Sequence, residues 1–68
     1  MTRPVLSPRE QEVARLVADR MSDDEIAGIL TISVRTVQTY LDRISKKLRA
    51  ERDRSSRRRV IRAWMSAA

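Results

Sequence analysis

Apolar residues recur every three or four positions in four segments of the chain, which is the spacing of one face of an α-helix. These positions are Val13, Leu16, Val17 and Met21; Ile26, Ile29 and Leu30; Val37, Leu41, Ile44 and Leu48; and Val60, Ile61, Trp64 and Met65. The pattern predicts four helices, over residues 8–19, 23–30, 34–49 and 56–65. The expected fold class is therefore all-α, with a single domain that takes in residues 1–68.

Two of the predicted helix starts carry a complete capping box. In this arrangement a serine before the helix accepts from the amide three residues on, and a glutamate there accepts from the serine amide. Ser7 and Glu10 fit it at the first helix, with Pro8 in the first helical position. Ser22 and Glu25 fit it at the second helix. For the fourth helix, the N-cap is expected at one of the adjacent serines 55 and 56.

The second and third predicted helices are separated only by residues 31–33, and Ser33 is a candidate N-cap for the third. Two helices joined in this way make a helix-turn-helix, whose second member can lie in the DNA major groove. Opposite its apolar stripe, the third helix carries Arg35, Gln38, Thr39, Asp42, Arg43 and Lys46. Because these groups match the hydrogen-bonding groups of base edges, they favour a DNA-reading face over a merely solvated one.

Composition narrows the function classes. The 68 residues include no Cys and no His, which removes thiolate nucleophiles, imidazole bases and the usual zinc ligands. We therefore expect no enzyme activity and no metal or cofactor, and a chain this short leaves nothing to bind a small-molecule ligand. No apolar run is long enough to span a bilayer and no export signal opens the chain, so we expect no membrane association and a cytoplasmic location.

Positive charge is concentrated in the second half of the chain. Residues 1–34 hold four basic and six acidic side chains, whereas residues 35–68 hold eleven and three. The basic residues after position 50 are Arg52, Arg54, Arg57, Arg58, Arg59 and Arg62. Six cations so close together favour neutralisation of DNA phosphates over a role in solubility alone. Three of them begin the fourth helix, where cations oppose the helix dipole, so some other interaction must favour them there.

Residues 6–48 resemble the LuxR-type helix-turn-helix family, also named for FixJ and GerE. The shared marks are Leu6-Ser7-Pro8-Arg9-Glu10 with Glu12-Val13, Asp24-Glu25-Ile26-Ala27, Ile32-Ser33, Thr36-Val37-Gln38, and the spaced set Leu41, Ile44, Lys47 and Leu48. The resemblance implies a tri-helical core plus a C-terminal helix 4, with helix 3 in the major groove. It also implies a stand-alone member of the GerE kind, without a sensory domain, and a homodimer formed through helix 4.

Site residues follow from the resemblance and from the charge pattern. Matched position by position, the family's base-facing places fall on Gln38, Thr39 and Asp42, and the outward face adds Arg35 and Arg43. The family's phosphate-facing places fall on Ser33, Val34, Thr36, Lys46 and Lys47, and the basic run adds Arg54, Arg57 and Arg58. The expected dimer contacts are Val60, Ile61, Trp64 and Met65. Tyr40, at a place where the family usually has His, is expected to complete the core.

Two departures from the family's pattern stand out. Phosphates repel a carboxylate, so Asp42 must find a cytosine amino group or a neighbouring Arg, or else pair within its helix with Lys46. The family also ends its first three helices with glycine, where this chain has Arg20, Thr31 and Arg49. A non-glycine residue at positive φ costs on the order of 1 to 2 kcal/mol, so these turns either differ from the family's or are strained.

The sequence predicts a sequence-specific regulator of transcription that binds double-stranded DNA. The alternative is a protein-interaction module that uses the same fold to bind RNA polymerase or another transcription regulator, which Asp42 on the reading face would favour. RNA binding is a weaker hypothesis, because only Tyr40 and Trp64 are able to stack on unpaired bases.

Overall fold

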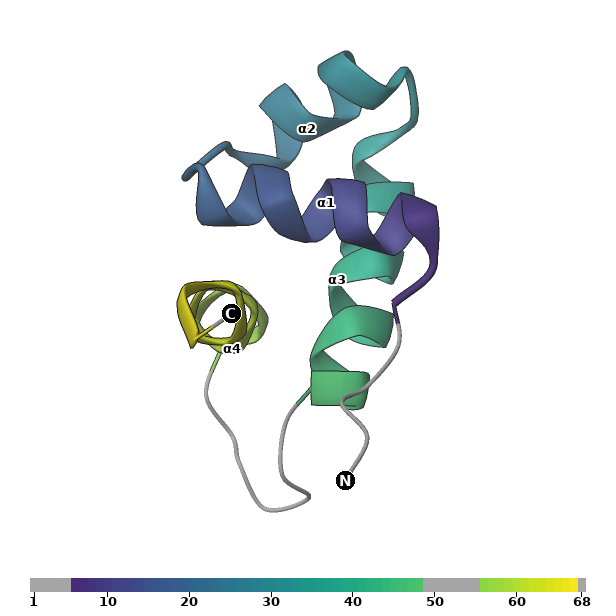
Figure 1. Cartoon of the computed structure of the whole chain (residues 1–68). Coiled ribbons are helices and arrows are strands. Elements are labelled where there is room, and N and C mark those ends of the chain that lie inside the picture. Colours follow the sequence, from purple (N-terminus) through teal and green to yellow (C-terminus); the bar gives the residue numbers. More distant parts are fainter. Residues whose placement is uncertain (1–5, 49–55, 68) are drawn as a thin grey trace.

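The computed structural model describes residues 6–48 and 56–67, which form four helices (Figure 1). They are α1 (Pro8–Ala18), α2 (Asp23–Leu30), α3 (Val34–Leu48) and α4 (Arg57–Ala67). No strand occurs in the described residues, and the expected all-α, four-helix class is confirmed. Compared with the predicted bounds, α1 ends one residue earlier, and α4 begins one residue later and ends two residues later. The predictions for Arg49 and Arg54 lie outside the described residues.

Both predicted capping boxes are present. Ser7 Oγ accepts from the Glu10 amide at 3.2 Å, and Glu10 Oε1 accepts from the Ser7 amide at 2.8 Å. At α2, Ser22 Oγ accepts from the Glu25 amide at 3.1 Å and Glu25 Oε1 accepts from the Ser22 amide at 2.9 Å. These bonds satisfy amides that the first turn of a helix otherwise leaves unpaired, so each start is defined locally.

The other two helices begin with a single serine cap. Ser33 Oγ accepts from the Thr36 amide at 3.0 Å, and Ser56 Oγ accepts from the Arg59 amide at 3.2 Å. Ser33 is thus confirmed as the N-cap of α3, and Ser56 as that of α4. Residues 31–33 form the turn between α2 and α3, as predicted.

One hydrophobic core joins all four helices. In Figure 1, α1 crosses α3, α2 lies above α1, and α4 is viewed end-on below it. Contacts from α4 run to both α1 and α3. The buried apolar side chains of this core are Leu6, Val13, Ala14, Val17, Ile26, Ala27, Val37, Leu41, Ile44 and Ile61.

Ile29 is an exception to the predicted stripe of α2, because its side chain is 55% exposed. The buried positions of α2 are Ile26 and Ala27, with Leu30 packed against the core. At 100° per residue these three point in similar directions, and Ile29 lies roughly 100° to one side of them. Small Ala27, on the other flank of Ile26 and Leu30, is buried, whereas the larger Ile29 is left at the surface.

The turns after α1 and α2 keep a left-handed residue although neither has glycine. Arg20 has φ 64° and Thr31 has φ 58°. After α1, the Met21 amide donates to Leu16 O and the Arg20 amide to Val17 O, at 3.1 and 3.0 Å, which is the Schellman pattern that ends many helices. Of the two expected outcomes, the turns therefore take the strained conformation, with the steric cost of a side chain at positive φ.

Candidate nucleic-acid interface

The six polar residues predicted to face outward from α3 are all exposed. They remain so because Val37, Leu41 and Ile44, on the opposite side, are buried in the core. The helix is long enough, at 15 residues, to present about four turns of this face to a partner. We refer to Arg35, Gln38, Thr39, Asp42, Arg43 and Lys46 together as the polar face.

Hydroxyl groups at the start of α3 are held by local hydrogen bonds. Ser33 Oγ lies 2.9 Å from Thr36 Oγ1, in addition to its bond from the Thr36 amide. Thr39 Oγ1 donates to the carbonyl oxygen of Arg35 at 3.1 Å. Because the Thr39 proton is engaged inside the helix, this side chain offers an approaching base its methyl group and oxygen lone pairs.

Asp42, the acidic member of the polar face, is paired with a residue of another helix. Arg57 Nη1 donates to Asp42 Oδ1 at 2.8 Å and to the carbonyl oxygen of Gln38 at 3.3 Å. The pair is at the surface, with the Arg57 side chain 37% and the Asp42 side chain 57% exposed. Of the interpretations left open by the sequence, the neighbouring arginine is the one found. No salt bridge joins Asp42 to Lys46 in the described residues.

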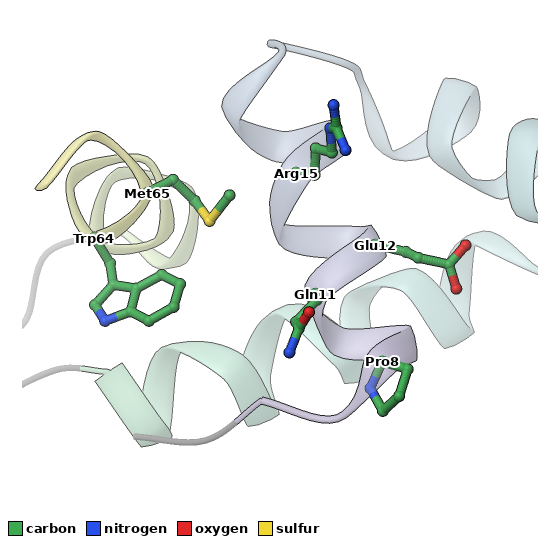
Figure 2. Close-up of a pocket in the computed structure, with 6 residues that line it drawn as sticks. All are labelled: Pro8, Gln11, Glu12, Arg15, Trp64 and Met65. Carbon is green, nitrogen blue, oxygen red and sulfur yellow. The ribbon is translucent and has the colours of Figure 1, made fainter. Parts of the chain in front are cut away.

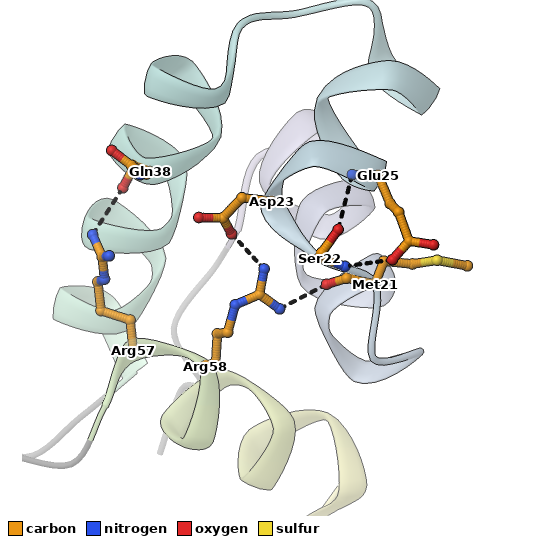
Figure 3. Close-up of polar contacts among 7 residues, drawn as sticks. All are labelled: Met21, Ser22, Asp23, Glu25, Gln38, Arg57 and Arg58. Atoms are coloured by element: carbon orange, nitrogen blue, oxygen red, sulfur yellow. Dashed lines mark hydrogen bonds and ion pairs between the residues drawn. The ribbon is translucent and has the colours of Figure 1, made fainter.

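Arg58, the next residue of α4, holds that helix to the start of α2 (Figure 3). Its Nη1 donates to Met21 O at 2.7 Å, and its Nη2 pairs with Asp23 Oδ1. The side chains of Arg58 and Asp23 are 27% and 28% exposed, so much of this link is shielded from water. Partners on α2 and α3 thus explain why arginines occupy the unfavourable N-terminal end of the α4 dipole.

Lys47 connects the end of α3 to the start of α1. Its Nζ donates to the buried carboxylate of Glu10 at 2.7 Å. This bond from Lys47 and the bond from the Ser7 amide hold the pKa of Glu10 below its ordinary value, against the opposing effect of burial. The carboxylate of a capping box therefore also serves as a tertiary link.

A basic hollow lies beside this link. It has a volume of about 510 Å³ and is lined by Ser7, Glu10, Tyr40, Arg43, Lys46 and Lys47. Tyr40 is half-buried and packs against the core while also lining the hollow, so it combines the core role expected of it with an exposed edge. Lys47 is paired with Glu10, and Arg43 and Lys46 leave the hollow with a net positive charge that attracts an anionic group.

The four residues predicted at a dimer interface divide into two kinds. Ile61 is 0% exposed and Val60 is 8% exposed within the single chain. Their side chains pack inside the single chain and have little surface to offer a second copy, so their place at a dimer interface stays a prediction. Trp64 and Met65 are half-buried and line a groove of about 670 Å³ between α1 and α4 (Figure 2).

The long-range ion pairs are the functional-site features that the sequence did not reveal. Arg57 with Asp42, Arg58 with Asp23 and Lys47 with Glu10 are separated by 15, 35 and 37 residues. The placement of arginines against the α4 dipole was a signal that partners exist, but it did not identify them. The sequence pattern also did not predict that Ser45 of α3 is fully buried.

The short α2, the three-residue turn and α3 with its exposed polar face make a helix-turn-helix, an arrangement found in many DNA-binding regulators. The chain belongs to the luxR family of bacterial regulatory proteins, whose family model matches residues 4–62. This confirms the resemblance identified on residues 6–48.

Known proteins are similar to this chain over about two thirds of its length. An HTH-type transcriptional regulator of Mycobacterium tuberculosis is 46% identical over 43 residues, which is 63% of this chain and 5% of that protein. The tetrathionate response regulatory protein TtrR of Salmonella typhimurium is 42% identical over 45 residues, or 66% of this chain and 22% of its own. The chain thus spans about a fifth or less of the length of these relatives. No solved structure matches it.

Two features are absent from residues 6–48 and 56–67, a membrane-spanning helix and a cluster of metal ligands. None of the described helices has the length and hydropathy that crossing a bilayer requires. Over the same residues, His, Cys, Asp and Glu side chains nowhere form a group of three or more able to hold a metal ion.

Proposed function

We propose that this chain binds double-stranded DNA sequence-specifically, with α3 in the major groove, and so regulates transcription in the cytoplasm. The single observation that carries the proposal is the polar face: six exposed side chains of mixed donor and acceptor character on one side of a helix whose other side is buried. The resemblance also implies a protein without a sensory domain. This stays a prediction, because the relatives are several times longer than this chain.

The proposed roles divide the surface into reading and positioning residues. Base edges meet the side chains of Arg35, Gln38, Thr39, Asp42 and Arg43. At the start of α3, phosphates are contacted by Ser33, Val34 and Thr36. Near the end of α3, they are contacted by Lys46 and Lys47, which line the basic hollow. Arg58 is assigned to the α2 link instead of to a phosphate, because its guanidinium has two partners there and its side chain is only 27% exposed. Lys47 is kept because its side chain is 43% exposed beside its bond to Glu10.

Selection of bound sequences from a random pool of duplexes tests the proposal. The wild-type chain is expected to enrich a defined sequence. Thr39→Ala and Gln38→Ala should change which bases are preferred, because they remove groups that meet base edges. Lys46→Ala should weaken binding to every sequence and reduce the slope of log affinity against log salt by about one.

Arg9→Ala is the matched control for Lys46→Ala. It also removes one positive charge, but from α1, where Arg9 Nη1 pairs with Glu12 Oε1 at 3.6 Å. Its affinity should stay near that of the wild type, and its salt slope should not change. If the Thr39, Gln38 and Lys46 variants all lost the same affinity on every sequence, α3 would not read bases.

The proposal includes a homodimer formed through α4, with a smaller contact surface than the sequence predicted. The surface offered to a second copy is the groove of Pro8, Gln11, Glu12, Arg15, Trp64 and Met65, which no residue of α3 lines. Half-buried apolar Trp64 and Met65 are the kind of side chains that anchor interfaces. Sedimentation of wild type and Met65→Glu tests this contact: the variant should shift the chain toward monomer, and two identical profiles would remove the groove from the proposal.

The same groove is the observation that favours the second candidate function, binding of RNA polymerase or another regulator. A partner held there leaves the polar face of α3 exposed. Capture of purified RNA polymerase by the wild type, lost in Met65→Glu but retained in Thr39→Ala, would support this function. Capture that depends on Thr39 instead would place the protein contact on α3 and contradict the DNA proposal.

A further inference from the structure

Arg57 brings a guanidinium from α4 to the edge of the polar face of α3 (Figure 3). Its two partners, the Gln38 carbonyl oxygen and the Asp42 carboxylate, lie one helical turn apart on the flank of α3 that meets α4. Contacts at both points fix where the guanidinium lies along that flank. Since both side chains are partly exposed, the pair is open to a ligand that approaches α3.

The pair presents a defined set of donors and acceptors. Among contacts of the described residues, both bonds from Arg57 use Nη1, so the Nη2 and Nε hydrogens are directed elsewhere. The bond to Asp42 uses Oδ1, which leaves Oδ2 as an acceptor. Together, Arg57 and Asp42 offer two neighbouring donors beside one acceptor.

This set is complementary to one base pair. In the major groove a G·C pair shows the N7 and O6 acceptors of guanine next to the N4 amino donor of cytosine. An A·T pair instead places the adenine N6 donor after its N7 acceptor, where it would face an arginine donor. A phosphate is a poorer ligand, because contact with Arg57 would bring it close to the like charge of Asp42.

We infer that Arg57 and Asp42 act as a unit that reads one G·C base pair. Arg57 donates to guanine and Asp42 both orients Arg57 and accepts from the cytosine amino group. The fourth helix thus adds a base-contacting residue to the third, in place of the phosphate contact that the sequence predicted for Arg57. The inference rests on the proposed function, that α3 enters the major groove.

Competition binding against the selected wild-type site, with each base pair replaced in turn, tests the inference. Arg57→Ala and Asp42→Ala should lose the preference for G·C at the same single position, a change of about tenfold or more, and keep the preferences at all other positions. The double variant should show the same loss as each single variant, because the two side chains act on one base pair. Arg57→Lys, which lacks the planar fork, should lose most of the preference.

Arg59→Ala is the matched control, because it removes an exposed positive charge from the same turn of α4. It should leave the preference at every position unchanged. Thermal unfolding by circular dichroism reports whether each variant is folded. If Arg57→Ala unfolds, Arg57→Lys and Asp42→Asn keep side chains of similar size in place and carry the test.

Three outcomes are distinguishable. Tighter binding of Asp42→Ala to all sequences, with its preferences unchanged, would show that Asp42 only repels DNA and would overturn the inference. Equal weakening of Arg57→Ala on all sequences would show a phosphate contact and would also overturn it. A wild-type chain that prefers no sequence at all would overturn the proposed function itself, before any variant is compared.

Discussion

The Nζ of Lys47 donates to the Glu10 carboxylate at 2.7 Å and thereby joins the last turn of α3 to the first turn of α1. Glu10 also accepts from the Ser7 amide, so one buried carboxylate serves the capping box and the packing of two helices. This arrangement ties the orientation of α3 to the helix that starts the domain.

Replacement of Glu10 by Gln should lower the free energy of unfolding by about 1 to 2 kcal/mol at neutral pH. The amide oxygen of Gln still accepts from the Ser7 amide, so the loss reports mainly the charged bond to Lys47. Urea unfolding measures it. Glu12→Gln, which breaks only the exposed 3.6 Å pair with Arg9, should change stability by less than about 0.5 kcal/mol.

The contribution of Glu10 should depend on pH in one direction. The pKa of Glu10 is lowered in the folded chain, so its stabilising effect is fully present above the ordinary glutamate pKa of the unfolded chain. The effect is lost as pH falls through the lowered pKa of the folded chain. The difference between wild type and Glu10→Gln in urea unfolding should therefore shrink on acidification, and a difference that stays constant would contradict the assignment.

Thr31→Gly should stabilise the chain by roughly 1 kcal/mol, because glycine adopts the φ of 58° without the clash of a β-branched side chain. Thr31→Ala is the control, because it shortens the side chain but keeps Cβ. It should gain less stability than the glycine variant. Urea midpoints compare the three chains. A less stable Thr31→Gly would mean that the Thr31 side chain makes up for the strain.

Gly28→Ala should stabilise α2 by about 1 kcal/mol, the difference in helix propensity between the two residues. Gly28 is exposed inside the helix, and a Cβ added there meets nothing within 4 Å. Ala63→Gly, at an exposed position inside α4, is the matched reverse change and should destabilise by a similar amount. A rise in melting temperature for the first and a fall for the second is the expected result.

Arg58→Ala should destabilise the chain by about 1 to 2 kcal/mol, because it breaks the bonds from α4 to Met21 and Asp23. Arg59→Ala, one residue on and exposed, should change stability by less than about 0.5 kcal/mol. Chemical unfolding of the two variants separates a structural arginine from a solvated one. If the two variants were equally stable, Arg58 would not be needed for the fold and would again be a candidate phosphate contact.

Local features of this protein were predictable from the sequence alone. The helix starts at Ser7, Ser22 and Ser33 depend on bonds that span three residues, and the polar face of α3 depends only on helical periodicity. Such features form in the same way however the helices pack, so the sequence alone predicts their residues. The fold class and family followed from the same short-range patterns.

Only the tertiary structure decided what the fourth helix does. The packing of α4 against α1 and α3 decides whether Arg57 meets Asp42 and whether Arg58 meets Asp23. It also decides that Ile61 faces the core of the single chain. Periodicity places an apolar stripe on a helix, but it does not say which surface covers that stripe. An ion pair between residues 15 to 37 positions apart forms only when packing brings the two helices together.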